Sequence, residues 1–375
     1  MKLSILQENL AQGIGIAARS ASAKASLPIL NHVLLTTDQG RLKISATNLE
    51  VGVNTWVGAK VEREGSLAVP ARVISELIQS LPAGKLELEV VKGNLNLKSG
   101  AVEANIAGIE GSEFPAIPSF PKSGAISFPA ATLAQAVEEV AYAAAAEEGR
   151  PVLTGVLWRV KGKLMELVAT DGYRLAQKKI ELPEKIDGDW QVVVPARSLS
   201  EVARIVADLT GAGEAPDEVR LALSAGENQI SFSLGSVELT SRLLEGNYPT
   251  VEQIIPTEAT IRGLFGRDEL QQAVRLATVF ARDIGNIVKL KLGPGGLDLS
   301  ANTAQVGDEK THLDGAVEGE ELQVAFNSRY LLDALSHFSK SQISLESKGN
   351  LSPGVLRAVG DETLTVLVMP VRLQG

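Results

Sequence analysis

Hydrophobic residues recur at helical spacing in three widely separated segments of the chain. After Arg72, apolar side chains stand at the second, fifth, sixth and ninth positions, and the same holds after Arg197 and Arg329. These residues are Ile74, Leu77, Ile78 and Leu81, then Leu199, Val202, Ala203 and Val206, and finally Leu331, Ala334, Leu335 and Phe338. Because this spacing lines one face of a helix, we predict an amphipathic helix after each arginine.

The similarity between the three segments extends beyond their apolar positions. They open with Val69-Pro-Ala-Arg72, Val194-Pro-Ala-Arg197 and Phe326-Asn-Ser-Arg329, so the arginines lie 125 and 132 residues apart. A repeat of that length is a domain, and we infer one domain design used three times. The acidic residue four positions after each arginine predicts an ion pair on the helix surface, worth about 0.2–0.5 kcal/mol. These acidic residues are Glu76, Glu201 and Asp333.

A second helix is predicted upstream of the first in each copy. Its apolar positions are Leu10, Ile14 and Ala17, then Leu133, Val137 and Val140, then Leu270, Val274 and Ala277. The position three residues after the first of these is always small, which suits close approach of the helix to a sheet. Gly13, Ala136 and Ala273 stand there.

Short segments with alternating apolar and polar residues predict strands between the helices. The clearest are Leu86–Val90, Leu95–Leu97, Val219–Leu223, Ile230–Leu234 and Ile343–Leu345. Two helices packed on antiparallel sheets in each copy give an α+β fold, and the helices are too few for a parallel, doubly wound sheet. Connectors that begin at Glu113-Phe-Pro115 and Asn247-Tyr-Pro249 place the domains at 1–121, 122–256 and 257–375.

The composition agrees with a well-packed protein. At 375 residues and 45% hydrophobic, the chain can form three cores of ordinary domain size. The sequence contains no Cys, which excludes disulfides and thiolate chemistry. The start Met-Lys-Leu-Ser lacks the apolar region of a signal peptide, and no apolar run is long enough to span a membrane, so we predict a cytoplasmic protein.

The sequence offers few candidates for catalytic chemistry. His32, His312 and His337 have no metal-ligand spacing and no cysteine partners. The segment Gly13–Ala18 fits a loose dinucleotide-loop pattern, but it lies inside a repeated helix, so helix packing explains it better. Asp171 is better explained by a turn at a strand end, because the other copies have Asn48 and Thr303 there. We therefore expect no enzyme activity, no metal and no cofactor.

The charge distribution leaves nucleic-acid binding open. A net charge of −9 is unlike that of an ordinary nucleic-acid-binding domain, which is usually basic. Several arginines nevertheless fall on or beside the repeated helices. If equivalent helices line one surface, that surface is more positive than the chain average.

Motifs spread over the whole chain resemble those of the beta subunit of bacterial DNA polymerase III, the bacterial sliding clamp family. They include Leu27–Leu30, Arg150–Gly155, Ala169–Ala176, Val194–Arg197, Ser241–Gly246, Tyr248-Pro249, Phe326–Leu335 and Met369–Leu373. Each is weak alone, but all occur in order over a threefold repeat. The resemblance implies a homodimer joined head to tail, closed into a ring of six similar domains around duplex DNA.

A ring would hold DNA by topology, so weak and salt-sensitive phosphate contacts from a mildly basic inner wall would suffice. By resemblance, Lys24 occupies the place of a basic residue in the family's inner loop, and the remaining candidates follow from their helices. The candidates for DNA contact are Lys24, Arg72, Arg197, Arg204, Arg275 and Arg282. For the ring seam, placement suggests Ile106, Val279 and Phe280.

The resemblance also implies a hydrophobic groove between the second and third domains, which receives short peptides from the replicative polymerase, the clamp loader and other proteins. The matching positions are Leu153, Thr170, Gly172, Tyr173, Arg174, Leu175, Pro249, Ile254, Asn327, Tyr330, Leu367, Met369, Pro370, Val371, Arg372 and Leu373. Without the family match, Leu175, Ile254 and Leu367 would read equally well as strand residues of domain cores. Two features depart from the family: Glu252-Gln253 stands where many relatives carry a basic residue, and Gln374-Gly375 extends the chain past Leu373.

Two other function classes remain open at this point. One is a scaffold built from repeats that binds peptides but never encircles DNA. The other is an α+β hydrolase with acidic residues in a cleft, which the missing acid–base pair disfavours.

Overall fold

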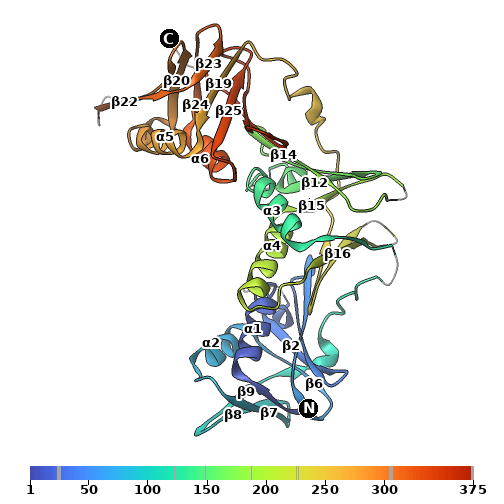
Figure 1. Ribbon diagram of the computed structural model, residues 1–375. Helices are drawn as coiled ribbons and strands as arrows, with labels where there is room; N and C mark the ends of the chain where they lie inside the picture. Colours follow the sequence, from blue (N-terminus) through green and yellow to red (C-terminus); the bar gives the residue numbers. More distant parts are fainter. Residues whose placement is uncertain are drawn as a thin grey trace. The chain divides into compact units, whose positions relative to one another are not determined.

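The computed structural model describes residues 1–22, 27–121, 124–147, 149–186, 188–224, 226, 228–303 and 307–372 (Figure 1). The chain folds into two compact units. The first unit comprises Met1–Ala134 and Glu201–Leu243, and the second comprises Gln135–Ser200 and Leu244–Gly375. In the described part, all paired strands run antiparallel, as the α+β prediction requires.

The first unit contains a five-stranded and a nine-stranded sheet. The smaller sheet has the order β5 (Lys60–Arg63), β1 (Lys2–Leu6), β7 (Lys85–Val91), β8 (Asn94–Ser99) and β9 (Val102–Ala107). The larger has the order β10 (Ile109–Glu110), β6 (Ser66–Pro70), β2 (His32–Asp38), β3 (Arg41–Thr47), β4 (Val51–Val57), β18 (Val237–Arg242), β17 (Gln229–Leu234), β16 (Glu218–Leu223) and β11 (Ile126–Pro129). Helix α1 (Gln7–Ala18) packs on α2 (Ala71–Ser80) and on β3 and β4.

The second unit has a nine-stranded and a four-stranded sheet. The larger has the order β15 (Trp190–Pro195), β12 (Gly155–Lys161), β13 (Leu164–Thr170), β14 (Arg174–Glu181), β27 (Asp361–Val368), β26 (Gly354–Ala358), β25 (Gln342–Ser347), β19 (Ile261–Gly266) and β23 (Ala316–Gly319). The smaller has the order β22 (Gly307–Asp314), β21 (Gly296–Thr303), β20 (Ile287–Gly293) and β24 (Leu322–Asn327). Helix α5 (Arg267–Ala281) packs on α6 (Ser328–Ser336) and on β21 and β22.

The predicted threefold repeat is visible in the order of elements. Each copy begins with a strand and a helix, continues through several strands to a second helix, and ends with three strands, to which the first copy adds the short β10. The central copy uses α3 (Ala130–Ala141) and α4 (Ala196–Gly211), which contribute residues to both units. Short 3-10 turns complete the chain: η1 (Pro28–Asn31), η2 (Gly111–Glu113), η3 (Pro151–Thr154), η4 (Val251–Gln253) and η5 (Arg282–Ile284).

The cores follow the apolar stripes predicted from the sequence. Ile74, Leu199 and Leu331 are buried, as are Leu10, Leu133 and Leu270 in the other helices. The small residue of the first helix is needed for packing, because a Cβ atom on Gly13 would lie 2.8 Å from both Ile44 Cδ1 and Val57 Cγ1. The dinucleotide-like segment is thus part of a helix pressed against its sheet.

The large sheets explain why there are two units although the sequence has three copies. Strand β4 of the first copy pairs with β18 of the second, and β14 of the second pairs with β27 of the third. Backbone hydrogen bonds therefore cross from one copy to the next inside each unit. The exact residues at which one domain ends and the next begins stay a prediction.

Only one of the three predicted helix-surface ion pairs forms as expected. Arg72 Nε donates to Glu76 Oε1 at 2.7 Å on the exposed face of α2. Glu201 instead accepts from Arg19 Nε at 2.6 Å, and Asp333 accepts from Arg174. The predictions for these two acids were wrong because a less exposed arginine from another element reaches each carboxylate, where water screens the attraction less.

Candidate functional site

Most residues predicted for a peptide groove come together in the second unit. The turn from Asp171 to Arg174 joins β13 to β14, and Tyr173 O accepts a hydrogen bond of 2.8 Å from Met369 N. The chain beyond β27 is held again where Val371 N donates to Ala325 O at 2.8 Å. The turn and the segment from Met369 to Arg372 are therefore neighbours, although nearly 200 residues separate them in the sequence.

The turn that carries Tyr173 has a close copy in the first unit. Thr170 Oγ1 donates to Arg174 O at 2.6 Å, and Asp171 Oδ1 accepts from the amides of Tyr173 and Arg174, both at 2.9 Å. In the first unit Thr47 Oγ1 donates to Val51 O, and Asn48 Oδ1 accepts from the amides of Glu50 and Val51. This confirms that Asp171 belongs to a strand-end turn.

Both turns need a residue in the left-handed region of φ. Gly172 has φ +91° in the second unit, and Leu49 has φ +75° in the first. Glycine reaches this region without strain, whereas leucine does so at a cost.

Beneath the turn lies a compact apolar cluster. It comprises Leu157, Val168, Leu175, Val193, Val251, Val355 and Leu367, with Val152, Leu244, Tyr248 and Ile255 packed against it. Leu175 and Leu367 are 2% and 1% exposed, and Leu153 is also buried, so these predicted groove residues behave as core residues here. Tyr173 and Ile254, in contrast, are 65% and 39% exposed and offer apolar surface to a partner.

Tyr248 fixes the second connector to this cluster, a role that was not predicted from the sequence. Its hydroxyl accepts a hydrogen bond from Thr170 N at 3.1 Å and donates to Val168 O at 3.3 Å. Burial raises the pKa of the Tyr248 phenol, which therefore stays protonated and able to donate. The available signal was the aromatic residue before proline at the start of both connectors, which is Phe114 in the first and Tyr248 in the second.

Arg174 is surrounded by rings and carboxylates. Its guanidinium carbon lies 4.7 Å from the ring centroid of Tyr330 and 5.4 Å from that of Tyr142. Its Nε donates to Asp171 Oδ2 at 3.0 Å, and its Nη1 donates to Asp333. Asn327, another predicted groove residue, caps α6 by accepting from Arg329 N at 2.9 Å.

A hollow adjoins the segment after β27. It has a volume of about 360 Å³ and is lined by Gln323, Val324, Ala325, Asn350, Leu351, Val371 and Arg372. Leu351, 60% exposed, is a further large apolar side chain available to a partner. Leu351 could not be predicted from the sequence, because no periodic pattern distinguishes an isolated leucine in a loop.

The remaining groove residues are placed as follows. Pro249 is exposed at the start of the second connector, and Pro370 is half-buried. Glu252 forms an ion pair with Arg159, so the position that departs from the family is occupied by a charge already paired within the chain. Leu373 and the tail Gln374-Gly375 lie outside the described residues.

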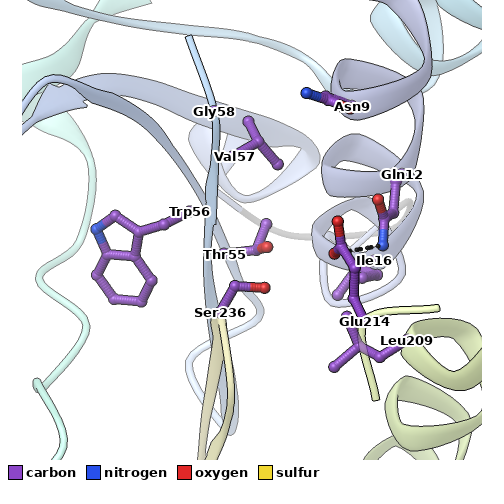
Figure 2. A pocket seen from close by; sticks show the side chains of 10 residues that line it. All are labelled: Asn9, Gln12, Ile16, Thr55, Trp56, Val57, Gly58, Leu209, Glu214 and Ser236. Atoms are coloured by element: carbon purple, nitrogen blue, oxygen red, sulfur yellow. Dashed lines mark hydrogen bonds between the residues drawn. The ribbon is translucent and has the colours of Figure 1, made fainter. Parts of the chain in front are cut away.

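A second hollow, of about 280 Å³, lies in the first unit between α1 and β4 (Figure 2). Gln12 Nε2 donates to Glu214 Oε2 at 3.2 Å across one side of it. The indole of Trp56 points away from the hollow, and its Nε1 donates to Asp38 Oδ2 at 2.7 Å. Among its described lining residues only Glu214 is charged.

The candidate DNA-contact residues are helix-surface arginines in the described part of the chain. Arg72, Arg197, Arg204, Arg275 and Arg282 are all exposed. Arg197 and Arg204 lie seven positions apart on α4 and therefore share a helix face. Lys24 lies outside the described residues.

The three seam candidates have different environments. Val279 on α5 is 52% exposed, and Phe280 beside it is half-buried. Ile106 on β9 belongs to the core of the first unit, so its side chain presents little surface to a partner. Strand β9 itself lies at the edge of its sheet, as does β22 in the second unit.

The histidines occupy ordinary structural positions. His32 Nδ1 lies 3.0 Å from Pro28 O, and His312 Nδ1 lies 2.8 Å from Asp298 Oδ1. His337 follows α6 and stacks on Tyr142 with ring centroids 4.1 Å apart. Within the described ranges no group of three or more histidine or acidic side chains is arranged to hold a metal ion. In those ranges, too, no helix combines the length and apolar character that a membrane span requires.

Comparison with known proteins covers nearly the whole chain. Family models for the DNA polymerase III beta subunit match in sequence: the N-terminal domain at residues 1–118, the central domain at 127–250 and the C-terminal domain at 252–372. The chain belongs to the DNA polymerase III beta subunit family. The beta sliding clamp of Synechococcus elongatus is 32% identical over 381 residues, which is 100% of both proteins. That of Bacillus subtilis is 29% identical over 384 residues, 99% of this chain and 100% of the relative.

Solved structures of the same family have the same fold as this chain. A DNA polymerase sliding clamp from Bacillus subtilis superposes with a TM-score of 0.94 at 28% identity, covering 100% of both chains. A sliding clamp from Pseudomonas aeruginosa bound to griselimycin gives 0.92 at 26% identity, again covering 100% of both. These findings confirm the predicted family, the α+β fold of three clamp domains and the function of a beta subunit sliding clamp in DNA replication.

Proposed function

We propose that this chain forms a ring from two copies joined head to tail, encloses duplex DNA and tethers other replication proteins through the groove of the second unit. The ring has no chemistry of its own and needs no cofactor. The observation that carries the proposal is a threefold repeated clamp fold in which the exposed Tyr173 and the segment after β27 lie together, joined by the hydrogen bond from Met369 N to Tyr173 O. Such a protein would work in the cytoplasm, where bacterial DNA is replicated.

Ring closure would join β9 of one copy to β22 of the other. Both are edge strands with unpaired backbone groups along one side, and such edges readily pair with another chain. Helix α5 packs on β22 and exposes Leu276 and Val279, which would add apolar surface to the contact. In this arrangement Ile106 supports β9 from within the core, while Val279 and Phe280 contact the partner.

The exposed helix arginines supply the weak attraction to DNA. Arg72, Arg197, Arg204, Arg275 and Arg282 would contact phosphates one at a time, without base preference, which permits sliding. Lys24 joins them as the inner-loop candidate. A net charge of −9 over the whole chain would discourage DNA from binding elsewhere on the surface.

The groove would bind a short apolar peptide from the polymerase, the clamp loader or another replication protein. Tyr173, Ile254, Met369 and Leu351 present apolar surface, and Met369 adapts to different side chains because it is flexible. A few polar groups around the turn and the segment Pro370–Arg372 would orient the peptide backbone. Leu153, Leu175 and Leu367 form the packed base on which these residues rest.

A topological experiment tests the ring. The protein is loaded onto nicked circular DNA with a clamp loader, and half the sample is then linearised. We expect retention on circles and rapid loss from linear ends. Equal retention on both would exclude a sliding ring and favour a scaffold that binds peptides without enclosing DNA.

The groove is tested with variants that spare the core. Ile254→Ala combined with Met369→Ala should weaken binding of a polymerase-derived peptide at least about tenfold, because each truncation of an anchor costs on the order of 1 kcal/mol or more. Leu164→Ala is the matched control, since Leu164 is another exposed large apolar residue in the second unit, on β13. Peptide affinity unchanged in the double variant would remove Ile254 and Met369 from the site.

A further inference from the structure

Arg174 and α6 are linked more closely than a simple groove-wall contact requires. Tyr330 and Asp333, three positions apart on α6, both face the Arg174 guanidinium. One turn later, His337 stacks on Tyr142, which also lies near Arg174. One face of α6, from the third copy, therefore docks on two residues of the second copy.

The charge of Arg174 is already satisfied within the protein. Its side chain is 13% exposed and has Asp171 and Asp333 as carboxylate partners. Two of its five N–H donors are given to these carboxylates, whose two negative charges offset its positive charge, and two rings lie beside it. Its main contribution to the groove therefore passes through the residues that it holds.

The first unit shows that the turn itself does not need an arginine. The equivalent turn has Asn48 and Val51 where the groove turn has Asp171 and Arg174, and it forms the same set of backbone hydrogen bonds. The arginine is thus an addition to a turn that folds without it. Of the two turns, the one that carries the arginine is the one that lies beside α6.

We propose that Arg174, together with Asp333 and Tyr142, is a positioning device that holds the first turn of α6, with Asn327 and Tyr330, in the conformation that receives a peptide. The proposal rests on the peptide-binding function proposed above. It gives Asp333 and Tyr142 an indirect role in peptide binding, because both act through their contacts with Arg174. Prior ordering of the wall lowers the entropy lost when the peptide binds.

The test compares two labelled peptides rich in leucine and phenylalanine, identical except that one carries Glu where the other carries Gln. Wild-type protein must bind both, and failure here would contradict the proposed function and not the role of Arg174. We expect Arg174→Val to weaken both peptides by the same factor, about tenfold, equivalent to about 1.4 kcal/mol. A loss confined to the Glu peptide would show direct contact with the ligand and overturn the proposal.

Two further measurements separate positioning from general stability. Asp333→Asn should weaken both peptides too, and the double variant with Arg174→Val should be no worse than the more affected single variant. Amide exchange over Ser328–Ser336 should speed up in both variants. Arg19→Val is the matched control, because Arg19 also pairs with two carboxylates, Glu201 and Asp208, but in the first unit.

A second variant, Asp171→Asn with Arg174→Val, separates loss of binding from loss of folding. At these two positions it has the residues of the first-unit turn, Asn48 and Val51, which folds without an arginine. This variant should keep the wild-type melting temperature within a few degrees while peptide binding falls as in Arg174→Val. Unchanged peptide affinity together with unchanged exchange in α6 would overturn the positioning role.

Discussion

A Cβ atom added to Gly52 would lie 2.7 Å from Cγ2 of Ile117, so no larger residue fits at position 52 while Ile117 keeps its place. Position 52 follows the first-unit turn as Leu175 follows the groove turn. In the second unit Leu175 packs in the apolar cluster that also contains Val251 of the second connector. In the first unit the strand residue is small (Gly52) and the connector residue is large (Ile117), whereas in the second unit the strand residue Leu175 is the larger one. In the first unit the side chain of Ile117 therefore fills the space beside the strand.

This exchange predicts the effect of Gly52→Leu. The new side chain would collide with Ile117 and should destabilise the protein by roughly 1–3 kcal/mol, the usual range for an overpacked core. Denaturant unfolding measures the change. Adding Ile117→Val, which restores the pairing of the second copy, should recover part of the loss, and strictly additive effects would contradict direct contact between the two positions.

The connector of the second unit gives a second prediction. Tyr248→Phe removes a hydroxyl that bonds both Thr170 N and Val168 O and leaves two buried backbone groups without that partner. We expect a loss of about 1–3 kcal/mol in the free energy of unfolding. Phe114 occupies the equivalent place in the first connector without a hydroxyl, so Phe114→Tyr is a useful comparison. A Tyr248→Phe variant as stable as wild type would show that the two hydrogen bonds contribute little.

The sequence predicted the repeated elements better than the site. Helix stripes and alternating strands depend on local periodicity, which is why Leu10, Ile74 and Leu331 were assigned to cores correctly. The partners of Glu201 and Asp333 could not be read in the same way, because Arg19 and Arg174 reach them across 182 and 159 residues. Motif matching found Arg174 through family resemblance, but only the packed structure shows that its charge is directed to Asp333 and not to solvent.

His312 offers a test of an exposed electrostatic contact. The hydrogen bond with Asp298 raises the pKa of His312 above its ordinary value of about 6.5, and that bond likewise lowers the pKa of Asp298. Because the pKa of His312 is raised in the folded protein, the attraction is fully present below about pH 6.5 as long as Asp298 is ionised, and it is lost as the pH rises through the folded pKa of His312. NMR titration of the His312 ring should give a pKa above the ordinary value in wild type.

The Asp298→Asn variant provides the control for this titration. Without the carboxylate the pKa of His312 should fall back towards the ordinary value, since Asp298 supplies both the hydrogen bond and the nearest negative charge. If the pKa of His312 were the same in the wild type and in the Asp298→Asn variant, the contact between His312 and Asp298 would be absent in solution.

Salt dependence distinguishes arginines that contact DNA from those that merely lie on a helix. Removing one arginine that neutralises a phosphate should reduce the slope of log affinity against log salt concentration by about 0.9. Arg204→Ala should produce this change for a short duplex, measured by fluorescence anisotropy between about 50 and 200 mM salt. Arg72→Ala should produce a smaller change, because Arg72 must first leave Glu76, its partner at 2.7 Å. Arg63→Ala is the control, since Arg63 is exposed and ion-paired but lies on strand β5 and not on a repeated helix. If Arg63→Ala and Arg204→Ala lowered the slope equally, the attraction to DNA would come from the general charge of the surface, and the helix arginines would have no special part in it.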